Sequence, residues 1–150
     1  MAFFKLIHLL SVVVWVGGMF FAYMVLRPSA AEALQPPERL QLWDQVFSRF
    51  FNWVWLASFS MLVSGLYMTY LYGGIPHIPH YVHAMLLLGV VMLAIFVYVF
   101  FAQYVRFNLA VTAKDWPKAA MVLVTIRKLV ATNLLIGAVT FAVVLFGRGI

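Results

Sequence analysis

The sequence predicts an all-α integral membrane protein, folded as a four-helix transmembrane bundle. The chain of 150 residues is 66% hydrophobic and only 9% charged, whereas soluble domains are nearer half apolar and a quarter charged. Four apolar stretches are each long enough to cross the hydrocarbon core, which takes about 20 residues. Lipid offers the backbone no hydrogen-bonding partners, so each stretch must be helical.

A single transmembrane domain is expected over residues 1–150, with helices at roughly 3–26, 50–72, 79–105 and 117–147. The first stretch is too long for a signal peptide and has no small-residue cleavage motif before Arg27. We therefore expect a retained helix that stops at Arg27-Pro28. For the fourth helix, Asp115 is a candidate N-cap and Pro117 lies in the first turn.

The connections between these helices differ in length. Residues 27–49 are expected to form a polar loop that carries a short amphipathic segment. Residues 73–79 contain two glycines and two prolines, which predict a tight turn. Residues 106–118 are expected to form a second polar loop.

Basic residues are concentrated at one set of helix ends. Eight of the ten Lys and Arg residues lie within 27–49 and 106–128, and only Lys5 and Arg148 lie at the opposite ends. Because positive residues stay in the cytoplasm, we expect both termini and the 73–79 turn to face outward from a bacterial inner membrane. The chain has no solvated basic domain, so nucleic acid is not an expected partner.

The four histidines are predicted to gather at the outward end of the bundle. His8 lies about one and a half turns into the first helix, and His83 lies about one turn into the parallel third helix, so the two share a depth. His77 and His80 lie at the outer end of the third helix. A histidine within a span is expected to face the bundle interior.

Two ligand chemistries fit this arrangement. A haem b could be held between His8 and His83, because imidazole is a common axial ligand and bundles bind cofactors between facing helices. Trp15 continues the face of His8 and would pack on the porphyrin. The alternative is a copper site built from His77, His80 and His83, since imidazole also suits copper. The chain contains no cysteine, which excludes thiolate metal sites and disulfides.

A second candidate site is cationic and lies at the other end of the bundle. Arg127, near the start of the fourth helix, and Arg49, near the start of the second, could clamp an anionic head group, a porphyrin propionate or a quinone oxygen. The alternative is that such side chains extend to the membrane interface without a ligand. One haem cannot reach both this clamp and the histidines.

Several short segments resemble a known family. Phe4 to His8, followed by Trp15 to Phe21, resembles the first helix of CopD-type copper-resistance membrane proteins and of the related HemJ-type protoporphyrinogen oxidases. Ser64 to Tyr67 resembles the end of their second helix, and Tyr81 to Leu86 the start of their third. Ile126 to Asn133 resembles the start of the CopD-type fourth helix.

The resemblance implies a four-helix membrane fold and either haem b binding or copper handling, with His8 and His83 as ligands. Met85 and Leu134 stand where the HemJ-type pattern has a lysine and an acidic residue, which does not favour protoporphyrinogen oxidation.

The leading hypothesis is a haem b-binding redox protein of the inner membrane, working with a redox partner or a quinone. The alternatives are a copper uptake or resistance protein and a scaffold subunit without a cofactor. The sequence leaves open whether the protein is an enzyme, such as a membrane oxidoreductase, and whether it forms a homo-oligomer.

Overall fold

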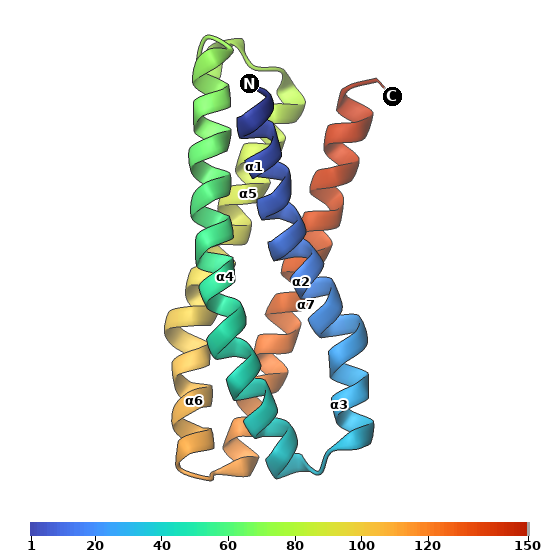
Figure 1. The fold of residues 1–150 in the computed structure, drawn as a ribbon, viewed down its shortest axis with the longest axis vertical. Coiled ribbons are helices and arrows are strands. Elements are labelled where there is room, and N and C mark those ends of the chain that lie inside the picture. Colours follow the sequence, from blue (N-terminus) through green and yellow to red (C-terminus); the bar gives the residue numbers. More distant parts are fainter. Residues whose placement is uncertain (150) are drawn as a thin grey trace.

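A computed structural model describes residues 1–149, which fold into four long helical segments without a strand. Figure 1 shows these segments running up and down the long axis of the molecule. Each of the four is long and apolar enough to cross a membrane, which confirms the predicted all-α four-helix bundle. The first segment consists of α1 (Ala2–Val12), η1 (Val13–Gly17), α2 (Gly18–Phe21), η2 (Ala22–Leu26) and α3 (Arg27–Ala33).

The other three segments follow after short connections. The second is α4 (Pro36–Leu71), and a 3₁₀ turn, η3 (Ile75–His77), separates it from the third. The third consists of α5 (His80–Tyr98), η4 (Val99–Tyr104) and α6 (Val105–Thr112), and the fourth is α7 (Trp116–Gly147). The segments η1, η2 and η4 are π-helical turns within otherwise continuous helices.

The predicted polar loops at 27–49 and 106–118 are wrong, because most of these residues are helical. Only Leu34 and Gln35 separate α3 from α4. The amphipathic segment within 27–49 belongs to α4, where Leu40, Trp43 and Phe47 are buried. These residues are helical because they pack against the core of the bundle. The segment is too polar to be recognised from sequence as part of a membrane span.

The predicted stop at Arg27-Pro28 is also wrong, since the helix continues through Pro28 to Ala33. Proline lacks an N–H and its ring clashes with the carbonyl four residues earlier. That carbonyl belongs to Met24, which lies within the π-turn η2 (Ala22–Leu26). A π-turn replaces the usual bonding pattern, so it accommodates the proline without ending the helix.

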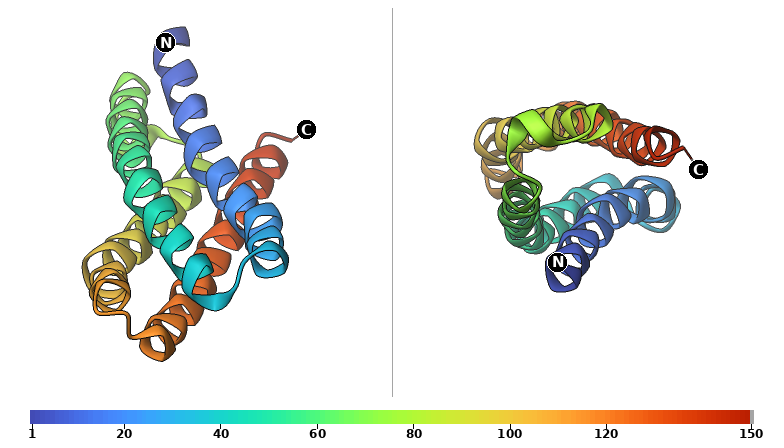
Figure 2. Two further views of the ribbon diagram at one scale, coloured as in Figure 1. Left: turned by 60° about the horizontal axis from the view of Figure 1, so that its bottom comes forward. Right: turned by 90° about the horizontal axis from the view of Figure 1, so that it is seen from above.

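The helices form two layers. The α1 helix packs mainly on α4, whereas α5 and α6 pack mainly on α7. Figure 2 shows the layer of α1–α4 lying against the layer of α5–α7. Both termini and the 73–79 turn lie at the same end of the bundle (Figure 1), as the even number of spans requires.

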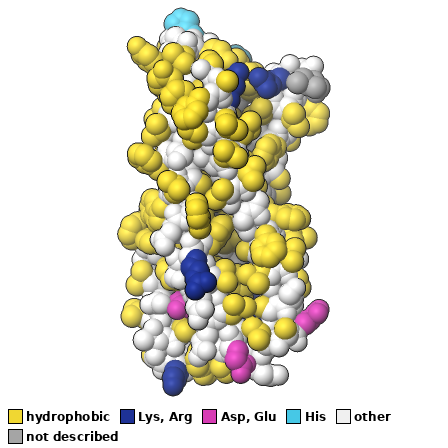
Figure 3. Space-filling model, in the orientation of Figure 1, with side chains coloured by type: hydrophobic (Ala, Val, Ile, Leu, Met, Phe, Trp, Pro, Cys, Tyr) yellow, Lys and Arg dark blue, Asp and Glu magenta, His cyan; other side chains and the backbone are white. Residues whose placement is uncertain are grey.

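The large buried side chains lie in the middle and in the half of the bundle away from the termini. Aromatic rings dominate this core, with Phe47 and Phe51 stacked at 5.2 Å and Phe107 edge-on to Phe47 at 5.7 Å. The outer surface is largely apolar: hydrophobic side chains cover most of the face in Figure 3, while charges are few. Such a surface fits contact with lipid acyl chains. Together with the four helices that are long and apolar enough to span, it indicates a multi-pass membrane protein.

Candidate functional site

His8 is half-buried on α1 and is held against α4. Its Nδ1 lies 3.1 Å from the Ser64 hydroxyl oxygen and 3.2 Å from the Met61 carbonyl oxygen. The Ser64 hydroxyl donates to the Ser60 carbonyl at 2.7 Å, so its oxygen accepts the proton of His8 Nδ1. This bonding pattern assigns the proton to Nδ1 and leaves the Nε2 lone pair free for a ligand.

Small residues on α4 permit this approach. Gly65 is buried, and a Cβ added to it would lie 3.4 Å from the His8 ring carbon Cε1. Ser11 and Ser64 are buried as well, each with its hydroxyl bonded to a carbonyl of its own helix. Small and hydroxyl residues are the usual way in which helices come close within a membrane. The sequence pattern by itself does not connect this part of α4 with His8, because small residues in a span carry no sign of which helix they face.

Two further histidines have the same bonding pattern as His8. His83 Nδ1 lies 3.2 Å from the Pro79 carbonyl oxygen, and His77 Nδ1 lies 2.8 Å from the Gly73 carbonyl oxygen. In each case the carbonyl can only accept, so Nδ1 donates, and in the neutral ring Nε2 is the nitrogen with a lone pair. Metal-binding histidines commonly have their second nitrogen bonded to a carbonyl in this way.

The turn between α4 and α5 sets these positions. Gly73 and Gly74 have φ angles of 94° and 89°, a left-handed region that favours glycine. Ile78 is buried and anchors the turn to the bundle. Pro79 is the N-cap residue of α5, so its carbonyl lies one turn before His83.

His80 and His83 form a pair on the first turn of α5. Their ring centroids are 6.3 Å apart, with an angle of 36° between the ring planes. His80 is exposed and His83 is half-buried. We call the end of the bundle that carries the N-terminus and residues 73–83 the histidine end.

The structure brings only part of the predicted histidine set together. Over residues 1–149, no group of three or more His, Asp or Glu side chains is close enough to hold a metal ion. His8 bonds to α4, whereas His83 bonds within the turn that starts α5. The joint site of His8 and His83 therefore stays a prediction.

Trp15 lies within the core. Its side chain is 1% exposed and meets Phe96 edge-on at 6.0 Å. It borders a small cavity of about 20 Å³ together with Asn133. Asn133 donates from Nδ2 to the Met92 carbonyl at 3.1 Å, while its Oδ1 has no hydrogen-bond partner among the described residues. A role for Trp15 beside a cofactor stays a prediction.

The two residues of the predicted cationic clamp, Arg49 and Arg127, do not lie at the same site. Arg127 borders a cavity of about 400 Å³ near the connections 34–35 and 113–115, whereas Arg49 is exposed on α4 and does not line it. Arg27 and Arg39 complete the lining instead. In the sequence, Arg27 and Arg39 stand out only as members of the basic residues at one set of helix ends. That pattern predicts topology but does not say which arginines lie close together.

A comparison with known families adds to this geometry. Residues 44–146 match the sequence model of the family described as copper resistance protein D, CopD. This chain belongs to the CopD family. The match covers most of α4, all of α5–α6 and nearly all of α7, so it includes His77, His80 and His83 but not His8 or Trp15.

No curated protein and no solved structure matches the chain. The family match confirms the CopD part of the resemblance. The relation to HemJ-type oxidases stays a prediction.

Proposed function

We propose that this CopD-family protein binds copper ions at its histidine end, as a step in copper uptake or resistance. The observation that carries the proposal is the pair of His80 and His83, whose ring centroids are 6.3 Å apart. An ion bonded at about 2 Å to one nitrogen of each ring separates the ring centres by about 6 Å. The pair lies within the region that matches the family.

The donor set at this end suits copper. Imidazole binds copper in both biological oxidation states, and thioethers favour Cu(I). His77 lies on the neighbouring turn, and Met85 follows His83 on α5, half-buried. The chain has no cysteine, so nitrogen and thioether donors are the ones available for a soft metal.

The bonding state of the histidines supports the same proposal. His83 and His77 each donate from Nδ1 to a backbone carbonyl, so in the neutral ring Nε2 carries the lone pair that would bind the metal. His8 has the same state deeper along α1. We propose it as a second ligand position, for an ion that has first bound at the exposed pair.

Orientation completes the proposal. The histidine end carries Lys5 and Arg148, whereas the other end carries eight of the ten basic residues. The positive-inside rule then places the histidine end outside the inner membrane. Copper ions outside the membrane would meet His77 and His80 first, because both residues are exposed.

The test is copper binding by the full chain in lipid nanodiscs, measured by titration with Cu(II) and with Cu(I). The double variant His80→Ala, His83→Ala should bind copper at least about 100-fold more weakly, taking each lost ligand as worth about tenfold. The control is Asn108→Ala, because Asn108 bonds to Asp44 at the opposite end. Equal binding by the double variant and the parent would contradict the proposal.

The same preparation tests the haem hypothesis. An absorption spectrum with a Soret band and sharp reduced α and β bands would show haem. If those bands are lost in both His8→Ala and His83→Ala while His80→Ala keeps them, the histidines serve as axial ligands and the copper proposal is overturned.

A further inference from the structure

A cavity of about 400 Å³ lies near the end of the bundle opposite the histidines. Three arginines from three different helical segments line it: Arg27 on α3, Arg39 on α4 and Arg127 on α7. We call this end of the molecule the arginine end. All three side chains are half-buried. Arg127 is far from the other two in sequence, and the fold brings it to the same cavity.

Among residues 1–149, no carboxylate side chain compensates these three charges. The chain has four acidic residues, and none of them lines the cavity. Asp44 accepts from Asn108 Nδ2 at 3.0 and 3.1 Å, and Asp115 accepts from the Lys118 N–H at the start of α7. The remaining two, Glu32 and Glu38, are exposed.

The charged groups near Arg127 are positive, like Arg127 itself. Arg27 and Arg39 both repel it electrostatically. The Arg27 guanidinium lies 4.6 Å from the centroid of the Tyr23 ring, a cation–π contact that fixes its position. The like charges of three half-buried arginines that line one cavity repel each other, and an anion bound among them would offset this repulsion.

The depth of the cavity places it at the edge of the hydrocarbon core. Counting about 20 residues for a span back from Phe146 along α7 reaches Arg127, and counting forward from Phe3 reaches Ala22, just before Arg27. The α4 helix has 36 residues and is about 54 Å long at 1.5 Å per residue. It therefore carries Arg39 beyond the hydrocarbon to the level of the head groups.

The other walls of the cavity are amphipathic. Trp43 and Trp116 line it, and tryptophan is enriched at membrane interfaces. Leu40 and Leu123 are buried in its wall, while Val124 is 41% exposed at its margin. A ligand with a phosphate and an acyl chain fits such a lining better than a free anion does, because the apolar walls remain covered.

We propose that this cavity binds the phosphate of an anionic phospholipid, with Arg27, Arg39 and Arg127 as the phosphate ligands. Arginine presents several donors in a planar fork that matches phosphate oxygens. Two arginines can hold the phosphodiester while the third meets further oxygens of the head group. The acyl chains would leave along the apolar surface beside α7. The site is separate from the histidines and does not depend on the proposed copper binding.

The experiment measures lipid binding to the purified full chain in neutral detergent by native mass spectrometry. Phosphatidylglycerol and phosphatidylcholine are titrated in parallel against the parent and the variants Arg27→Gln, Arg39→Gln and Arg127→Gln. Each variant should bind phosphatidylglycerol about tenfold more weakly, since a hydrogen bond to a charged group is worth roughly that factor. The matched control is Arg49→Gln, because Arg49 is exposed on α4 outside the cavity.

Each outcome has a definite meaning. Loss in the three cavity variants with no change in Arg49→Gln supports the site. Equal loss in all four variants shows nonspecific attraction to a basic surface and overturns the proposal, as does equal binding of phosphatidylcholine and phosphatidylglycerol by the parent. Competition by inorganic phosphate at the concentration of the lipid would make a soluble phosphate the ligand and overturn the lipid assignment. Circular dichroism of the variants reports whether they are folded.

Discussion

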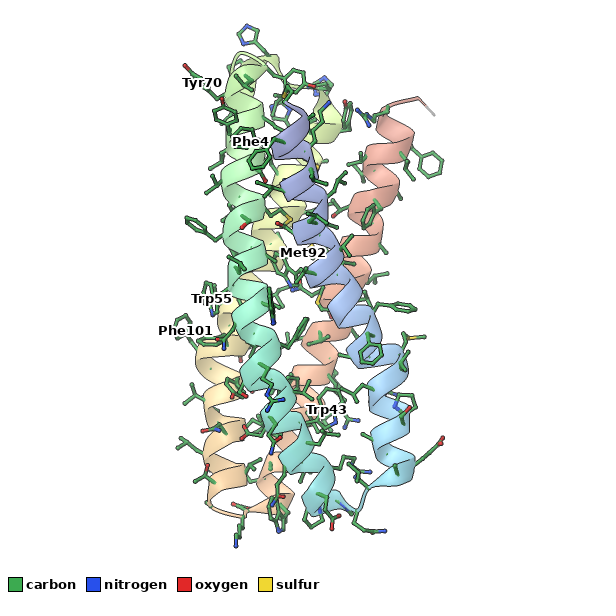
Figure 4. All side chains as sticks on the ribbon, in the orientation of Figure 1. Phe4, Trp43, Trp55, Tyr70, Met92 and Phe101 are labelled. Atoms are coloured by element: carbon green, nitrogen blue, oxygen red, sulfur yellow. The ribbon has the colours of Figure 1, made fainter. Side chains whose placement is uncertain are left out.

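The histidine end and the arginine end are built from the same four helices but are packed in different ways. At the arginine end, large side chains such as Trp43, Phe47 and Phe107 are buried, with exposed fractions of 4%, 4% and 0%. At the histidine end, the buried residues of α1 and α4 are small and polar, among them Ser11 and Ser64. Figure 4 shows Trp43 within the lower half of the bundle, with Phe4 and Tyr70 near the histidine end.

The difference concerns what each end can do. A core of interlocking rings holds its neighbours in one arrangement, which suits a cavity where three like charges must be kept together. Small residues and hydroxyls allow helices to approach closely and leave imidazole nitrogens accessible. The proposed anion site thus lies at the end with the aromatic core, and the proposed copper site at the end with small buried residues.

The first prediction concerns which end faces which side, and its outcome is all or none. A reporter enzyme that is active only in the periplasm should work when fused after Ile150, because the basic residues at the arginine end keep that end in the cytoplasm. The same reporter inserted between α6 and α7, at residues 113–115, should be inactive. Activity at the 113–115 insertion instead would invert the topology, and the histidines could not then meet copper from outside.

The second prediction tests the aromatic core of the arginine end. Phe107→Ala should lower the free energy of unfolding by about 3–5 kcal/mol, the usual cost of removing a buried phenyl ring. The matched control is Phe101→Ala, since Phe101 is 63% exposed and points away from the bundle in Figure 4. The control should change stability by less than about 1 kcal/mol. Both values come from chemical unfolding in mixed micelles, and similar losses for the two variants would mean that the rings do not form one core.

The sequence predicts the number, type and direction of the helices but not where they end. A membrane span is recognised from the hydrophobicity of its residues, which is a property of each residue and does not depend on how the helices pack. The extension of α4 back to Pro36 depends on burial of Leu40 and Trp43 against other helices, which a polar-looking segment does not reveal. The passage through Pro28 depends on the π-turn η2 before it.

At the two candidate sites, too, the sequence predicts where residues lie along a helix but not which residues of other helices they meet. Counting turns along the helices predicts that His8 and His83 share a depth, but it does not say which helix each one faces, and His8 bonds to α4. The three-residue spacing from His80 to His83 does predict that these two lie close together, because three residues make nearly one turn of a helix. Arg27 and Arg39 could not be assigned to Arg127 from sequence, since only the packing of α3, α4 and α7 brings them to one cavity.

The third prediction has the smallest effect and concerns the bond that orients His8. Ser64→Ala removes the acceptor 3.1 Å from His8 Nδ1 and also the bond from the Ser64 hydroxyl to Ser60. Thr69→Val is the matched control, because the Thr69 hydroxyl is buried on the same helix and bonds to the Gly65 carbonyl, four residues back, at 3.0 Å. The difference between the two variants therefore isolates the contact between helices.

We expect Ser64→Ala to cost about 0.6 kcal/mol more than Thr69→Val in the free energy of unfolding, the average for a hydrogen bond between membrane helices. The Met61 carbonyl, 3.2 Å from Nδ1, remains as an acceptor, so nitrogen-15 spectra of the imidazole should still show the proton mainly on Nδ1. Equal costs for the two variants would mean that Met61 alone orients the ring. A proton that moves to Nε2 in Ser64→Ala would mean that Ser64 keeps His8 ready to bind a metal, and copper transfer to His8 should then slow in that variant while binding at His80 and His83 is kept.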